Sequence, residues 1–144
     1  MFDKVLYPTD FSEVARKALA FTARLREAGA REVVVLHVID SRNFDALPSH
    51  MPTDFVQIQK AWEDKAAEEL KAVAGELRGQ GYEVKERLES GVPFNEILRV
   101  AEEENASVIV LGSHGKSNLA EMFLGSVSEK VIRKSKKPVL VVKR

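Results

Sequence analysis

Five short apolar runs recur along the chain with a helix-like stretch between each pair, and this alternation limits the possible folds more than any other feature. The runs occupy residues 4–8, 32–39, 82–88, 107–111 and 138–142. Two of them, EVVVLHVI and SVIVL, are rich in β-branched residues and almost continuously apolar, which is typical of strands buried on both faces. The run at 82–88 alternates apolar and charged residues, which predicts a strand with less cover.

The stretches between the runs have the three- and four-residue spacing of amphipathic helices. They predict helices at residues 12–28, with Gly29 as the stop, at 54–80 and at 127–134, and one that begins at Pro93. The longest, 54–80, carries an apolar stripe that we expect to face the core, namely Phe55, Ile58, Trp62, Ala66, Leu70, Val73 and Leu77.

Two details concern the start of this long helix. Asp54 and Gln57 have the spacing of a capping box, which predicts a helix that begins at Asp54. Residues 41–53 hold Pro48 and Pro52 among polar residues and are interpreted as an irregular loop.

Strict alternation of strands and helices predicts an α/β fold, with parallel strands, right-handed crossovers and helices on both faces of the sheet. A length of 144 residues predicts one doubly wound, three-layer domain over residues 1–144. A mixed sheet with one antiparallel strand is the alternative.

Composition excludes several classes of protein. The chain has no Cys, which removes disulfides, Cys-ligated zinc, iron–sulfur clusters and thiol nucleophiles. The 22 basic and 22 acidic residues balance, which argues against a general nucleic-acid binder. No apolar run approaches the roughly 20 residues that span a bilayer, and the first residues lack a signal sequence. We therefore expect a cytoplasmic protein with neither a membrane nor a nucleic-acid partner.

Sheets of this type bind ligands beyond the carboxyl ends of their strands, where the strand order reverses. The candidate loops are residues 9–11, 40–53 and 112–126. We therefore look for chemistry in these three segments.

The loop at 112–126 holds Gly112-Ser-His-Gly115, nine further residues, and Gly125-Ser126 at the start of a helix. Glycines permit close backbone approach, and a helix start offers free N–H groups to a phosphate. Lys116 could neutralise a terminal phosphate, and Ser128 adds a hydroxyl. The alternative is structural, because Ser126 has capping-box spacing to Glu129 and the glycines could simply turn the chain.

This spacing, G-x2-G-x9-G-[S/T], resembles the nucleotide-binding signature of the ATP-binding branch of the universal stress protein family, and Gly112, Gly115, Gly125 and Ser126 fit every fixed position. The segments KVLYPTDFS, LHVID and KKPVLVVKR are also similar to that family. The resemblance implies a Rossmann-like domain of the adenine nucleotide alpha hydrolase type, with four helices and a five-stranded parallel sheet in the order 3-2-1-4-5.

The resemblance also implies roles for individual residues. Asp10 falls where the family contacts the adenosine, Val38 where backbone groups read adenine, and Pro8 and Thr9 along the sugar. The implied phosphate-binding stretch comprises Gly112, Gly115, Gly125, Ser126, Val127 and Ser128, with Lys116 and His114 at variable positions.

Two residue types have structural alternatives. Asp10 also has capping-box spacing to Glu13, so it is a candidate helix cap, although we favour contact with nucleotide. His37 lies inside an apolar run and is interpreted as a core residue, and Trp62 and Phe55 are interpreted as core rather than as a cofactor site.

Three functions follow from these observations. The first is an ATP-binding regulatory switch of the stress response, with Mg²⁺ beside the nucleotide and an unidentified protein partner. The second is a slow ATPase or autophosphorylating enzyme, for which no catalytic residue is assigned because no base accompanies Lys116 and Ser126. The third is a nucleotide-free dimeric interaction module. The family order places the last strand at the sheet edge, so we expect a homodimer there. No protein-bound metal site is expected.

Overall fold

One parallel sheet organises the computed structural model, which describes residues 1–45, 52–114 and 124–143. Its strands are β1 (Lys4–Pro8), β2 (Glu32–Asp40), β3 (Glu83–Gly91), β4 (Val108–Gly112) and β5 (Val139–Val142). They pair in the order β3-β2-β1-β4-β5, and every pairing is parallel. The predicted fold class and strand order are therefore confirmed, and the mixed-sheet alternative is wrong.

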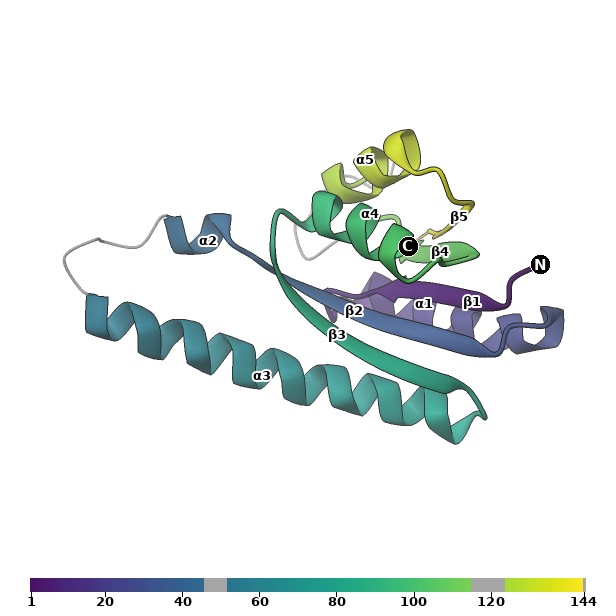
Figure 1. The fold of residues 1–144 in the computed structure, drawn as a ribbon, viewed down its shortest axis with the longest axis horizontal. Coiled ribbons are helices and arrows are strands. Elements are labelled where there is room, and N and C mark those ends of the chain that lie inside the picture. Colours follow the sequence, from purple (N-terminus) through teal and green to yellow (C-terminus); the bar gives the residue numbers. More distant parts are fainter. Residues whose placement is uncertain (46–51, 115–123, 144) are drawn as a thin grey trace.

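Helices cover both faces of the sheet (Figure 1). They are α1 (Glu13–Arg24), α2 (Arg42–Asp45), α3 (Pro52–Gly79), α4 (Pro93–Glu103) and α5 (Ser126–Lys134), with a 3₁₀ turn, η1 (Leu25–Ala28), after α1. One core lies under α1 and α3, and the other lies under α4 and α5. Successive side chains of a strand point to opposite faces of the sheet. In β2, Val33 and Val35 therefore belong to the first core, and Val34 and Leu36 belong to the second.

Three predicted boundaries need correction. Residues 41–53 are not all irregular, because 42–45 form α2 and α3 already begins at Pro52. Asp54 therefore lies inside α3 and does not precede it. The helix predicted at 12–28 is divided, because α-helical geometry ends at Arg24 and η1 continues to Gly29, whose φ of 102° stops it.

The apolar stripe of α3 is buried along only part of its length. Leu70 and Leu77 are buried, whereas Ile58 is 37% and Trp62 41% exposed within this chain. A 28-residue helix is about 42 Å long. The nine-residue strands beside it span about 30 Å. The amino-terminal part of α3 consequently extends past the sheet (Figure 1), so the expectation that Trp62 lies in the core is wrong.

None of the helices in the described part of the chain is both long enough and apolar enough to cross a membrane.

Candidate functional site

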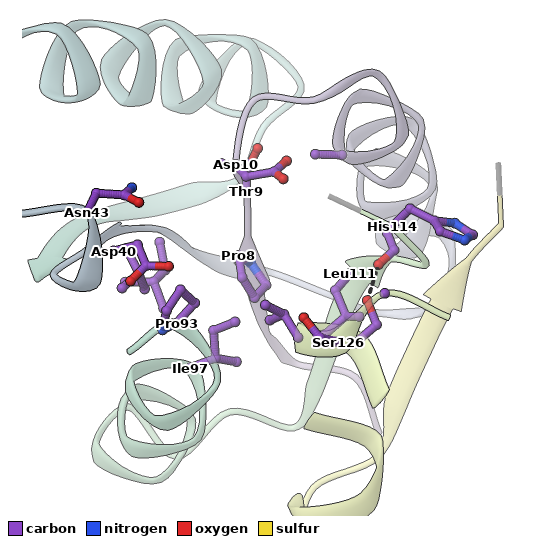
Figure 2. Close-up of a pocket in the computed structure, with 17 residues that line it drawn as sticks. Pro8, Thr9, Asp10, Asp40, Asn43, Pro93, Ile97, Leu111, His114 and Ser126 are labelled. Carbon is purple, nitrogen blue, oxygen red and sulfur yellow. Dashed lines mark hydrogen bonds between the residues drawn. The ribbon is translucent and has the colours of Figure 1, made fainter. Parts of the chain in front are cut away.

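A pocket of about 330 Å³ lies where the strand order reverses, at the carboxyl ends of β1, β2 and β4 (Figure 2). All nine predicted site residues that the structure describes line it, namely Pro8, Thr9, Asp10, Val38, Gly112, Gly125, Ser126, Val127 and Ser128. Gly115 and Lys116 lie outside the described residues. The topology thus brings together residues that are far apart in the sequence.

Asp10 enters the pocket from the turn between β1 and α1 (Figure 2). Its Oδ1 accepts a hydrogen bond from the amide of Ser12 at 3.0 Å. The cap of α1 is Ser12, whose hydroxyl oxygen accepts from the amide of Ala15 at 3.2 Å. The interpretation of Asp10 as the helix cap is therefore wrong, and its carboxylate instead stabilises the turn beside the pocket.

The end of β2 supplies the opposite side of the pocket. The last β2 residue paired with β1 is Leu36, so residues 37–40 continue along the pocket without a β1 partner. Asp40 and Asn43 both line this side (Figure 2). Arg42 donates to the two carboxylate oxygens of Asp40 at 2.9 and 2.7 Å, which lowers the pKa of the Asp40 carboxyl below its ordinary value. Asp40 is therefore charged and already engaged.

Gly112 ends β4 in close contact with α1. A methyl group added there would lie 2.7 Å from Cγ1 of Val14 and 3.2 Å from its backbone carbonyl carbon. The hydroxyl of Ser128 donates to the carbonyl oxygen of Gly112 at 2.6 Å. The prediction that the Ser128 hydroxyl is available to a ligand needs correction, because its proton is used within the protein. Its oxygen can still accept.

The start of α5 forms the third side of the pocket. Gly125 is the N-cap, and its amide donates to the carbonyl of Ser113 at 2.7 Å. Among the described residues, no side chain caps the helix. The interpretation of Ser126 as the cap is therefore wrong, since Ser126 is already the first helical residue. The first α5 hydrogen bond runs from the amide of Glu129 to Gly125, which leaves the amides of 126–128 without a partner inside the helix.

The histidines differ from expectation. His37 is half-buried and its Nδ1 lies 2.8 Å from the carbonyl oxygen of Thr9, so it contacts the site loop as well as the core. His114 lines the pocket and is buried, with Nδ1 2.8 Å from the Ser113 hydroxyl, and its Nε2 has no hydrogen-bond partner among the residues that the structure describes. His50 lies outside the described residues.

Several residues that line the pocket were not predicted from the sequence. Asp40 and Asn43 belong to a loop that we singled out, but no motif distinguishes them there. Pro93 and Ile97 line the pocket from α4. The connection from β3 places the start of this helix beside the pocket. Their only sequence signal is the helix start at Pro93.

The pocket combines an apolar wall with polar groups at its rim. Pro8, Val38 and Ile97 belong to the wall, the carboxylates of Asp10 and Asp40 accept hydrogen bonds, and the start of α5 attracts anions. Within the described residues, no cluster of three or more His, Cys, Asp or Glu side chains could hold a metal ion. This arrangement suits a ligand with a flat or apolar part, hydroxyl or amino donors and an anionic group.

Comparison with known proteins identifies relatives of this chain. The model of the universal stress protein family matches residues 1–143. Universal stress protein MJ0577 of Methanocaldococcus jannaschii is 42% identical, over 100% of this chain and 96% of its own length. Its solved structure has a TM-score of 0.90 and covers 100% of this chain and 97% of that one. YxiE of Bacillus subtilis is 34% identical over 99% of this chain and 100% of its own length.

One solved relative contains a ligand. The universal stress protein of Archaeoglobus fulgidus in complex with dAMP is 26% identical to this chain, with a TM-score of 0.66. The match covers 99% of this chain and 98% of that one.

Proposed function

The chain belongs to the universal stress protein family, and on that premise we propose that it binds ATP, accompanied by Mg²⁺, in the pocket at the carboxyl end of its sheet. The observation that carries the proposal is the convergence on one pocket of all nine predicted site residues that the structure describes. The adenine nucleotide in the Archaeoglobus fulgidus relative supports the same class of ligand.

The pocket fits the two ends of a nucleotide. The backbone amides of 126–128 would hold phosphate oxygens, because they precede the first α5 hydrogen bond and lie at the positive end of the helix dipole. The wall that includes Val38 and Ile97 would hold the base, and the Asp10 carboxylate would accept from a ribose hydroxyl or the adenine edge. Bound Mg²⁺ would neutralise phosphate charge.

We propose a regulatory role in the stress response for the nucleotide. Bound nucleotide would contact β1, β2 and α5 together, so the empty and occupied forms would present different surfaces to a protein partner. The geometry offers positioning groups for a ligand, and we therefore expect ATP to act mainly as a bound regulator. We propose that the protein acts in the cytoplasm.

Calorimetric titration of nucleotide-stripped protein with Mg-ATP tests the proposal. We expect a dissociation constant near 1 μM, roughly −8 kcal/mol. Gly125→Ala and Gly125→Val form a graded series, because each adds bulk at the start of α5 and leaves the amide of 125 able to donate to Ser113. Affinity should fall from wild type to alanine to valine while circular dichroism shows an unchanged fold.

Other outcomes identify other functions. Undetectable binding up to millimolar Mg-ATP would contradict the proposal and favour a nucleotide-free interaction module. Steady-state hydrolysis above about 1 s⁻¹ that is lost in Gly125→Val would instead identify an enzyme. Titrations with AMP, a cyclic nucleotide and GTP would define which nucleotide the pocket prefers.

A further inference from the structure

Phe11 has a backbone conformation that a large side chain rarely adopts. Its φ is 64°, in the left-handed region, which favours glycine and is strained for an aromatic residue. It immediately follows Asp10 in the turn beside the pocket. Strain of this kind persists only where the surrounding structure holds the residue, and it occurs often at functional sites.

The imidazole ring of His37 in β2 contacts this strained residue. The rings of Phe11 and His37 stack with centroids 4.6 Å apart and planes 27° from parallel. The Nδ1 of His37 lies 2.8 Å from the carbonyl oxygen of Thr9. Because a carbonyl oxygen only accepts, Nδ1 carries the proton and donates it. The phenyl ring also packs against the cluster that holds Ile39 and Ala66.

Asp10 is therefore held from both sides. On one side, Thr9 makes three hydrogen bonds. Its amide donates to the carbonyl oxygen of Leu36, and its carbonyl oxygen accepts from Nδ1 of His37. Its hydroxyl oxygen accepts from the amide of Phe11 at 3.0 Å. On the other side the amide of Ser12 donates to the Asp10 carboxylate. Phe11 and His37 are not among the described residues that line the pocket, so we expect them to act on a ligand through this turn.

We propose that Phe11 and His37 are positioning residues, which fix the Asp10 carboxylate for the nucleoside end of the ligand. This inference rests on the proposed function, since it assigns the turn a task within that nucleotide site. The strained backbone of Phe11 brings its ring onto β2, and the stacked imidazole ties the carbonyl of Thr9 to the same strand.

Four variants separate the ring contact, the hydrogen bond and the strain. Phe11→Gly removes both ring and strain, whereas Phe11→Tyr keeps both. His37→Asn retains a donor near the position of Nδ1 and loses the stack, and His37→Phe keeps a ring and loses the donor. Phe2→Ala is the matched control, because Phe2 is also a partly buried phenylalanine against the same core as Phe11.

Titrations with Mg-ATP, adenosine and inorganic tripolyphosphate measure the effect on each end of the ligand. Phe11→Gly and His37→Phe should weaken ATP and adenosine by about tenfold or more, the scale of one hydrogen bond to a charged group. Tripolyphosphate affinity should stay within about twofold, as should all affinities of Phe11→Tyr and Phe2→Ala. Equal losses for tripolyphosphate, or unchanged adenosine affinity in Phe11→Gly, would overturn the inference.

A second readout needs no ligand. Amide hydrogen exchange at Ser12 reports the hydrogen bond to Asp10, and it should accelerate in Phe11→Gly and His37→Phe but not in Phe2→Ala. If wild-type protein fails to bind Mg-ATP, the proposed function fails. If wild type binds but Ser12 exchange and adenosine affinity are unchanged in the variants, only the positioning role fails.

Discussion

Gly112 lies where β4 passes closest to α1, and its missing side chain leaves the space that Val14 occupies. Its φ lies outside the left-handed region, so the need for glycine there is one of space and not of backbone conformation. The sequence pattern suggested either ligand approach or a turn at this position. The structure adds a third reason, the packing of a helix against the strand that leads into the pocket.

We expect Gly112→Ala to destabilise the protein by about 1–3 kcal/mol, because its methyl group would lie 2.7 Å from Cγ1 of Val14. Urea unfolding of the single variant and of Gly112→Ala combined with Val14→Ala measures this. The pair should lose less than the sum of the two singles. Gly75→Ala is the control, since nothing lies within 4 Å of the added methyl in the interior of α3, and it should stabilise by about 0.5–1 kcal/mol. Equal effects of the two alanines would contradict this account.

Glu104 is a buried carboxylate that three cations share. Its oxygens lie 2.6 Å from Nζ of Lys85 and 3.3 Å from both Lys4 and Arg87. The hydrogen bond from Lys85, helped by Lys4, lowers the pKa of the Glu104 carboxyl below its ordinary value of 4.5. Its contribution to stability is therefore complete above pH 4.5 and is lost as the pH falls through the lower pKa of the folded protein.

Glu104→Gln should accordingly cost about 1.5–3 kcal/mol at pH 7, because neutral glutamine leaves the cations without their shared anion. The difference from wild type should shrink as the pH falls below 4.5. Chemical denaturation between pH 3 and 7 measures both effects. Exposed Glu102→Gln is the control and should stay within about 0.5 kcal/mol. A difference independent of pH would contradict this account, because glutamine matches glutamate in shape and lacks its titrating charge.

At the scale of elements, α3 has a buried and an overhanging part. Leu77 is fully buried at one end, whereas Val56 is 63% exposed at the other. Helical spacing is continuous through both parts, because it records one face of a helix and contains no information about where the sheet stops. Sequence reasoning therefore found the helix and its face but not the extent of its burial.

This division predicts uneven stability along α3. Leu77→Ala should cost about 2–5 kcal/mol, the usual range for a buried leucine. Trp62→Ala, at a side chain 41% exposed, should cost clearly less despite its larger size. Urea unfolding ranks the two, and amide exchange should be slower at 70–77 than at 55–62. A more damaging Trp62→Ala would contradict this division of α3.

The remaining elements show what the sequence can and cannot determine. Four of the five strands were predicted within one residue at either end, because buried apolar runs leave few other arrangements, whereas the less covered β3 ends three residues later than predicted. Helix starts were harder, since the spacing of Asp10 to Glu13 suggested a cap at Asp10, whereas in the fold the cap of α1 is Ser12. The glycine signature identified the α5 side of the pocket. Asp40, Asn43 and Ile97 reach it by tertiary proximity, for which one sequence carries no signal.

At the scale of the whole molecule, the sheet has two edges of different character. The β3 edge alternates charged residues such as Glu83, Lys85 and Arg87, and such charges oppose pairing with another sheet. The β5 edge consists of VLVV, with Leu140 38% exposed. An uncharged apolar edge strand is suited to pairing with a second copy about a two-fold axis.

We therefore expect a homodimer through β5, near twice the 16.1 kDa mass of the chain, at micromolar concentration. Leu140→Lys should convert it to a monomer in multi-angle light scattering, because the two-fold would bring both introduced charges into one interface. The fold should survive, since Leu140 already contacts solvent. Val56→Lys is the matched control, as an exposed apolar residue of α3, which packs against β2 and β3 on the other side of the sheet from β5, and it should leave the mass unchanged. A monomeric wild type, or a dimer that Leu140→Lys does not disturb, would contradict pairing at this edge. In the latter case the apolar overhang of α3 would be the surface to test next.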